Sequence, residues 1–233
     1  MPEDLISQLI ATARAMAAAG LNRGTAGNLS VRGERGKSSE GGTGGKGGES
    51  GSSGDREGFW ITPTGMAAED LEPGDIPFVA MDGSWQGRRA PSSEWRFHRD
   101  IYAARPEAGA VLHAHSPYAV SLACLRRDIP PFHYMIARFG GDTVRCAGYA
   151  TFGTQELSDA ALAALAGRNA CLLANHGLLL FGRDLRQALA LGIELEELCG
   201  QYWRACQLGE PVLLSETEMA VVLEKFQTYG QPR

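Results

Sequence analysis

The sequence predicts a single-domain α/β sandwich in which a central, largely antiparallel β-sheet is flanked by helices. Three observations support this fold class. The chain has 233 residues, the size of one ordinary domain. Its hydrophobic content of 44% and charged content of 21% are typical of globular proteins. Segments with helical and strand patterns are mixed irregularly, without the strict strand–helix–strand alternation of a parallel sheet.

Five segments are predicted to be helices. In the first, apolar residues such as Leu5, Leu9 and Met16 recur at helical spacing, and Gly20 follows as a stop signal. The last one opens with the capping box Ser215-x-x-Glu218. The predicted ranges are 3–19, 92–104, 158–165 with Ser158 as cap, 184–206 and 216–226.

Short apolar runs bounded by turn residues predict the strands. Asp82-Gly83 is a hairpin turn signal after one of them. Asn175-His176-Gly177 separates the last two strands and indicates a tight turn. The predicted strands are 29–32, 59–62, 78–81, 110–114, 143–147, 171–174 and 178–181.

A low-complexity insertion interrupts the chain at about 33–58. Of its 26 residues, 11 are Gly and 5 are Ser, and none is apolar. Such a segment buries too little apolar surface to offset the entropy lost on ordering, so a disordered surface loop between two strands is expected. Residues 1–233 are otherwise expected to form one domain.

Composition excludes several classes of partner. The net charge of −5, with no cluster of Lys or Arg, argues against nucleic-acid binding. The longest apolar runs are far shorter than a membrane span, and the first residues are acidic, unlike a secretory signal. The five cysteines contain no C-x-x-C pair, so they are expected to be buried free thiols of a cytoplasmic protein.

Three of the five histidines have positions suited to metal binding. His113 and His115 are two apart at a strand end, so both can face one ion. His176 lies in the turn between two strands. Three imidazoles with a free fourth position are typical of catalytic zinc. A histidine pair in a strand is also compatible with simple packing, so this pattern alone leaves both interpretations open.

Glu94 stands at the start of a predicted helix, where acidic residues are common for dipole reasons alone. Ser92 and Ser93 precede it, and a helix N-terminus offers free N–H groups to a phosphate. The turns at 25–28 and 61–65 add hydroxyl groups and exposed backbone. Together these segments predict an anion pocket beside a metal.

The sequence resembles the class II aldolase/adducin family over almost its whole length, except for the insertion. Further similarity at 133–137, 149–154 and 221–230 indicates the L-fuculose-1-phosphate aldolase branch. The motifs that carry the family resemblance occur in the family's order: Gly24-Thr25-Ala26-Gly27-Asn28-Leu29-Ser30, Ile61-Thr62-Pro63-Thr64-Gly65, Ser92-Ser93-Glu94, His113-x-His115 and Asn175-His176-Gly177.

The resemblance implies a zinc-dependent aldolase that cleaves a ketose 1-phosphate into dihydroxyacetone phosphate and a short aldehyde such as L-lactaldehyde. It implies one Zn²⁺ per subunit and a C4 homotetramer with sites at subunit interfaces. Ala174-Asn175 replaces the Gln-His that many relatives carry before the third histidine. The implied roles are zinc ligation by His113, His115, His176 and Glu94, acid/base catalysis by Glu94, aldehyde contacts by Tyr134 and Tyr229, and phosphate binding by Gly27, Asn28, Thr64, Gly65, Ser92 and Ser93.

Other activities stay open within this resemblance. A phosphopentose 4-epimerase uses the same metal site but characteristically has Asp at the position of Glu94. Other sugar-phosphate lyases, a non-enzymatic adducin-like scaffold, other aldehydes, and Mn²⁺ or Co²⁺ are further alternatives. A Schiff-base aldolase is excluded because two of the three lysines, Lys37 and Lys46, lie in the glycine-rich insertion.

Overall fold

The computed structural model of the chain describes residues 2–35 and 56–228. Within these residues the strands form one eight-stranded sheet in the order β4-β3-β2-β1-β5-β8-β7-β6. Neighbouring strands run antiparallel except β6 and β7, so the predicted fold class is confirmed. The strands are β1 (Asn28–Arg35), β2 (Arg56–Ile61), β3 (Phe78–Ala80), β4 (Trp85–Gln86), β5 (Ala110–Ala114), β6 (Arg145–Ala147), β7 (Ala170–Leu173) and β8 (Gly177–Gly182).

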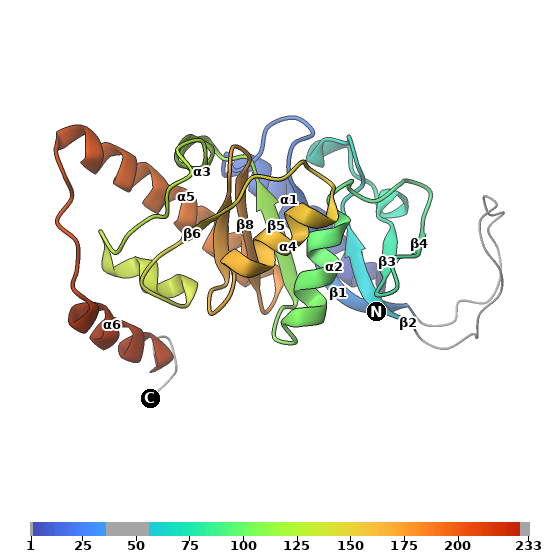
Figure 1. Cartoon of the computed structure of the whole chain (residues 1–233). Coiled ribbons are helices and arrows are strands. Elements are labelled where there is room, and N and C mark those ends of the chain that lie inside the picture. The colour runs from blue at the N-terminus through green and yellow to red at the C-terminus, as the bar shows by residue number, and fades with distance from the viewer. Residues whose placement is uncertain (1, 36–55, 229–233) are drawn as a thin grey trace.

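Helices cover both faces of the sheet (Figure 1). α2 and α4 lie on one face, and α1, α3 and α5 lie on the other, while α6 packs against the short helix η3 at one end. The α-helices are α1 (Pro2–Ala18), α2 (Trp95–Ala104), α3 (Pro117–Ala123), α4 (Gln155–Ala164), α5 (Leu185–Leu208) and α6 (Glu216–Thr228). The 3-10 helices are η1 (Ala68–Asp70), η2 (Pro73–Asp75) and η3 (Tyr134–Phe139).

Side chains alternate between two apolar clusters along the central strands. On β5, Leu112 packs into the cluster below α1 and α5, whereas Val111 packs into the cluster below α2 and α4. His113 therefore faces the α2 side, where its ring lies 5.5 Å from that of Phe97. The register of β1 and β5 places Asn28 opposite His113, so both residues belong to the same face at the centre of the sheet.

The helix beginnings differ from the predictions at two positions. α2 begins at Trp95 and not at residue 92, because Glu94 has the non-helical angles φ −98° and ψ 13°. The Ser92 N–H bonds the Thr62 carbonyl of a neighbouring loop. α4 begins at Gln155, where the Thr154 hydroxyl accepts a hydrogen bond from the backbone N–H of Leu157. Ser158 is buried inside α4 and donates to Asp100, so its prediction as a cap was wrong.

The expected disorder of residues 33–58 was wrong at both ends of this range. Gly33, Glu34 and Arg35 are paired in register with Gly58, Glu57 and Arg56 of the next strand. The backbone hydrogen bonds of an antiparallel ladder form without apolar side chains, so composition concealed these strand ends. The prediction of disorder for the remainder concerns residues 36–55, which lie outside the described residues.

Two further expectations can be compared with the structure. Cys146, Cys171 and Cys199 are at least partly buried, but Cys124 and Cys206 are exposed, so the prediction of five buried thiols was wrong. These two residues lie at or near the C-terminal ends of α3 and α5, where a helix leaves the core.

Among the described helices, none combines the length and the apolar character that crossing a bilayer requires.

The helix α3 was not predicted, and its first turn depends on a residue far away in the sequence. The carboxylate of Glu196 on α5 accepts hydrogen bonds from the Ser116 hydroxyl and from the backbone N–H groups of Tyr118 and Ala119, at 2.6–2.9 Å. These N–H groups have no partner within the helix, so a distant side chain caps it.

Replacing Glu196 by Ala is expected to lower the free energy of unfolding by about 2 kcal/mol, because it leaves three polar groups without their acceptor. Urea unfolding followed by circular dichroism measures this loss. Glu197→Ala is the matched control, since Glu197 is exposed and accepts a hydrogen bond from Gln201 one turn later. Equal stability of the two variants would show that this cap contributes little.

Candidate metal centre and active-site cavity

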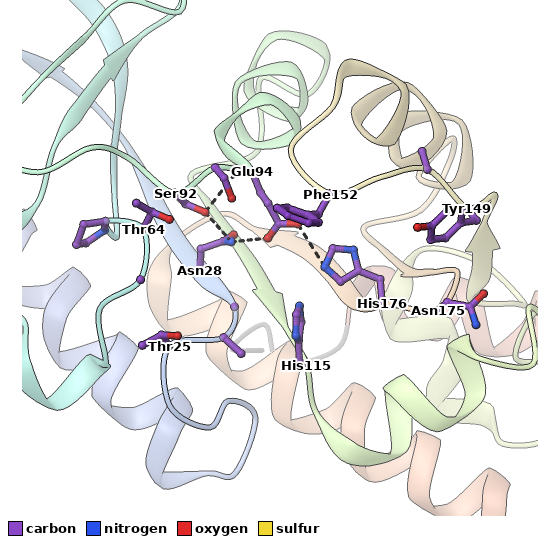
Figure 2. Close-up of a pocket in the computed structure, with 16 residues that line it drawn as sticks. Thr25, Asn28, Thr64, Ser92, Glu94, His115, Tyr149, Phe152, Asn175 and His176 are labelled. Atoms are coloured by element: carbon purple, nitrogen blue, oxygen red, sulfur yellow. Dashed lines mark hydrogen bonds and ion pairs between the residues drawn. The ribbon is translucent and has the colours of Figure 1, made fainter.

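A cavity of about 320 Å³ opens at the end of the central strands, above the face that carries His113. Its lining comes from segments that are far apart in the sequence (Figure 2). Thr25 and Thr64 lie at one end, Tyr149 and Asn175 lie at the other, and His176 lies between them. The lining residues are Thr25, Ala26, Gly27, Asn28, Pro63, Thr64, Gly65, Ser92, Ser93, Glu94, His115, Tyr149, Ala150, Phe152, Asn175 and His176.

Three imidazoles converge at the base of this cavity. His113 is the fourth residue of β5, His115 follows the end of that strand, and His176 lies in the turn between β7 and β8. One ring nitrogen from each of them lies within 4.8 Å of the others. Gly177 allows this approach, because a Cβ atom there would lie 2.3 Å from the carbonyl oxygen of Ala114. The structure therefore brings together the three histidines that the sequence singled out.

The surroundings of these rings favour neutral imidazoles with free lone pairs. His113 Nδ1 donates to the carbonyl of Leu178 at 2.8 Å, which leaves Nε2 directed toward the other rings. Burial, together with the nearby His115, lowers the pKa of His113 to about 3. Burial, followed by the electrostatic interaction with His113, lowers the pKa of His176 to about 4, and burial also lowers the pKa of His115. Neutral imidazole is the form that binds metal ions.

Glu94 completes the cluster from the N-terminus of α2. Its Oε2 lies 3.3 Å from His113 Nε2, and its Oε1 lies 3.3 Å from His176 Nε2. The carboxylate is buried, and Oε1 accepts no hydrogen bond within the described part of the chain. Asn28 Nδ2 donates to Oε2 at 2.8 Å and to Ser92 Oγ at 2.9 Å.

This donor set fits a divalent cation. The free Glu94 oxygen and the lone pairs of the neutral imidazoles meet around one point. These groups repel one another unless a cation lies between them. Ligand atoms of a tetrahedral zinc site lie about 3.3 Å apart, because the bonds are about 2.0–2.1 Å long. The two contacts of Glu94 match this separation at 3.3 Å, and His113 Nε2 and His115 Nε2 are 2.9 Å apart.

The predicted phosphate-binding residues lie along one end of the same cavity. Asn28 and Ser92 are buried, whereas Thr64, Gly65 and Ser93 are exposed to the opening. Gly27 lines it as well and has a φ of +73°, in the left-handed region that favours glycine. Among the described lining residues none is Lys or Arg, so an anion here depends on hydroxyl, amide and backbone donors.

Of the two predicted tyrosines, Tyr134 lies in the described part of the chain and is not part of this cavity. Tyr134 begins η3, is half exposed and is absent from the lining. Tyr229 lies outside the described residues, so both roles stay predictions. Conversely, Tyr149, Phe152 and Asn175 line the cavity without having been assigned a role, although all three belong to segments that carried the resemblance.

The turn Asn175-His176-Gly177 is a local signal that could have identified Asn175 as a residue of the cavity lining. The φ of Asn175 is +55°, a conformation that Asn tolerates better than most residues, and it stands directly before His176. The Arg126 side chain donates to its Oδ1 at 2.7 Å and lies over the ring of Tyr149. The Asn-His-Gly turn signal thus marks a lining residue as well as a candidate ligand.

Comparisons with known proteins agree with this geometry. The family described as "Class II Aldolase and Adducin N-terminal domain" matches residues 7–203. A 5-methylthioribulose-1-phosphate/5-deoxyribulose-1-phosphate aldolase of Rhodospirillum rubrum is 53% identical over 95% of this chain and 90% of its own length. An L-fuculose phosphate aldolase of Escherichia coli K12 is 43% identical over 97% and 95%. A solved L-fuculose 1-phosphate aldolase superposes with a TM-score of 0.83 at 37% identity, covering 96% of each chain.

These relatives span the full fold, including the sheet that carries the three histidines. Two predictions are confirmed at the level of family and reaction class. The chain is a metal-dependent aldolase with lyase activity, and it resembles L-fuculose-1-phosphate aldolases. The family match and the two relatives cover nearly the whole chain, and the cavity with its three-imidazole cluster agrees with them. The chain therefore belongs to the class II aldolase and adducin family.

Proposed function

We propose that this enzyme reversibly cleaves a ketose 1-phosphate into dihydroxyacetone phosphate and a short aldehyde, with zinc as its metal. The observation that carries this proposal is the meeting of Glu94 with three imidazoles in a cavity whose far end is lined by hydroxyl and amide groups. His113, His115 and His176 would hold the ion, joined by Glu94 when substrate is absent.

Two of the relatives favour a substrate whose carbon 5 carries no hydroxyl group and is therefore apolar. Besides the Rhodospirillum rubrum aldolase, a Bacillus thuringiensis relative at 36% identity is named as a 5-deoxy-D-ribulose 1-phosphate aldolase. In this chain the exposed rings of Tyr149 and Phe152 offer apolar surface to the aldehyde half of such a substrate. We therefore place 5-deoxyribulose and 5-methylthioribulose 1-phosphates first and L-fuculose 1-phosphate second.

The bound cation supplies Lewis-acid stabilisation of the negative charge that develops on substrate oxygens. In the condensation direction, Glu94 takes a proton from the hydroxyl-bearing carbon of dihydroxyacetone phosphate. The electron pair left on that carbon forms the bond to the aldehyde carbon, and the aldehyde oxygen takes a proton from Tyr134 or Tyr229. Cleavage follows these steps in reverse.

The phosphate end serves to position the substrate. Asn28, Thr64, Ser92 and Ser93 would provide side-chain donors, and Gly27 and Gly65 would provide accessible backbone. The lining residues Ser92 and Ser93 directly precede the N-terminus of α2, where the helix dipole favours an anion. Holding the phosphate there keeps the reacting carbon against Glu94, which converts an encounter between molecules into a reaction within one complex.

An assay of dihydroxyacetone phosphate release tests this function. Zinc-loaded protein is incubated separately with 5-methylthioribulose 1-phosphate, 5-deoxyribulose 1-phosphate, L-fuculose 1-phosphate and L-ribulose 5-phosphate. We expect product from the three ketose 1-phosphates, with kcat/KM highest for the first two. An epimerised pentose phosphate from the fourth would favour the epimerase instead, and no reaction with any of them would contradict the aldolase. Removing the metal and restoring Zn²⁺, Mn²⁺ or Co²⁺ identifies the effective ion.

We also propose a C4 homotetramer with active sites at the subunit interfaces. Tyr134 lies outside the cavity of its own chain, so a role on the aldehyde requires a neighbouring subunit. Large apolar side chains are also exposed near the C-terminal end, among them Leu208, Val212 and Val221. Light scattering after size exclusion should give four times the chain mass of 24.9 kDa, and a monomer mass would contradict the assembly.

A further inference from the structure

A chain of buried polar side chains leads from the interior of the protein to Glu94. Tyr102 OH lies 2.8 Å from Ser30 Oγ, and Ser30 Oγ lies 2.7 Å from His98 Nδ1. On the other side of the ring, His98 Nε2 lies 2.6 Å from Asn28 Oδ1, and Asn28 Nδ2 donates to Glu94 Oε2. None of the five residues is more than 7% exposed.

The Asn28 amide sets the direction of the hydrogen bonds nearest to Glu94. Its Nδ2 donates to both Glu94 Oε2 and Ser92 Oγ, so its Oδ1 faces His98, and an amide oxygen only accepts hydrogen bonds. Nε2 of His98 therefore carries the proton that is donated to Asn28.

The state of the His98 ring sets the remaining directions. Complete burial lowers the pKa of His98 well below its usual value, so the ring is neutral and Nδ1 accepts. The Ser30 hydroxyl then donates to His98 and accepts from the Tyr102 hydroxyl. Each donor in the chain thus points toward the cavity.

The His98 ring is held firmly in this orientation. It stacks on Phe97, with ring centroids 4.8 Å apart, and lies nearly parallel to the ring of Phe59 on β2. A reversed Asn28 amide would place its oxygen against the Glu94 carboxylate and its NH₂ against the His98 N–H. With Nε2 protonated, His98 adds to the cost of the reversed amide, beside the repulsion from Glu94, although it does not line the cavity itself.

We propose that His98 is a positioning residue, which orients the Asn28 amide and through it both Glu94 and Ser92. The Asn28 NH₂ group bonds the carboxylate and the Ser92 hydroxyl together, so one amide orientation aligns the base with the phosphate end. The catalytic meaning of this arrangement rests on the proposed function, whereas the orientation itself rests on the hydrogen bonds alone.

The test compares His98→Leu with His98→Gln in zinc-loaded protein. Leu removes the donor to Asn28, whereas the amide of Gln retains a donor near the position of Nε2. We expect kcat to fall about 10- to 100-fold in His98→Leu, the range that a small misplacement of reacting groups produces, and to recover largely in His98→Gln. Ser158→Ala is the stability control, because it removes a buried hydrogen bond to Asp100 on the same face of the sheet.

A double-mutant cycle separates positioning from simple destabilisation. If His98 acts through Asn28, His98→Leu has almost no further effect on kcat in an Asn28→Ala background, whereas independent effects would multiply. Multiplying effects, or full kcat in His98→Leu, would overturn the proposal. A kcat of His98→Gln as low as that of His98→Leu would also overturn the proposal, because the hydrogen-bond donor to Asn28 would then make no difference.

A second readout does not depend on activity. In ¹⁵N NMR spectra of the wild-type protein, His98 should show a protonated Nε2 and an unprotonated Nδ1 at neutral pH. The opposite tautomer would overturn the proposal. An inactive wild-type enzyme with the expected tautomer would instead contradict the aldolase function and leave the amide orientation standing.

Discussion

Replacement of His113 by Ala is expected to remove the metal ion and to lower kcat at least 10³-fold. His113 is the most buried of the three candidate ligands and lies in contact with both His115 and Glu94. Losing only a hydrogen-bond partner behind a ligand typically weakens metal binding about 10- to 100-fold, so losing the ligand itself should cost more. Without the ion, charge on the substrate oxygens loses its stabilisation.

Metal content by mass spectrometry of the purified protein measures the first effect, and steady-state kinetics measures the second. His113→Asn serves beside His113→Ala, because it leaves a smaller cavity in the core. His133→Ala is the matched control for metal content, since His133 caps η3 and is not part of the three-imidazole cluster. A full equivalent of metal with wild-type turnover in the His113 variants would rule out this centre.

Replacement of Glu94 by Gln is expected to lower kcat about 10³-fold while metal binding is retained. Gln has the same length and its carbonyl can still accept from Asn28, but it cannot take a proton from the substrate. General-base catalysis typically contributes about 10²- to 10⁴-fold. The three imidazoles stay in place, so the loss should appear in kcat more than in KM for the ketose phosphate.

Exchange of the substrate carbon-bound proton with deuterated water tests the role of Glu94 directly. Wild-type enzyme should exchange one proton of dihydroxyacetone phosphate without any aldehyde present, and Glu94→Gln should not. Glu156→Gln is the control, because Glu156 lies in the first turn of another helix, α4, outside the cavity. Undiminished exchange in the Glu94 variant would assign the base to another residue.

Local sequence patterns predicted most of the framework. The spacing of apolar residues located α1, and the Ser215–Glu218 capping box forms as predicted. Asp184, predicted as the first residue of the long helix, is the N-cap of α5. The two-residue spacing of His113 and His115 and the turn around His176 likewise predicted rings near one point, and the structure brings them together. These signals depend on a few neighbouring residues, which is why one sequence suffices to detect them.

The same local patterns failed where a partner comes from far along the chain. α3 is capped by Glu196, about eighty residues later, and nothing near Ser116 reveals this. Ser92 could begin a helix by its type, but its backbone is bonded to the loop after β2. Thr154 and Ser158 are equally good caps by composition, and only the packing of α4 on α2 decides between them.

The kinds of groups available follow from the order of the amino acids alone: three imidazoles, a carboxylate and a set of hydroxyl and glycine turns, on strands and turns of one α/β fold. Which of these groups meet depends on how distant segments pack. Glu94 approaches His176 although they are far apart in the chain, burial makes the imidazoles neutral, and His98 orients Asn28 from within the core. Periodicity is a property of neighbouring residues, whereas proximity, desolvation and hydrogen-bond direction arise only when distant segments pack together.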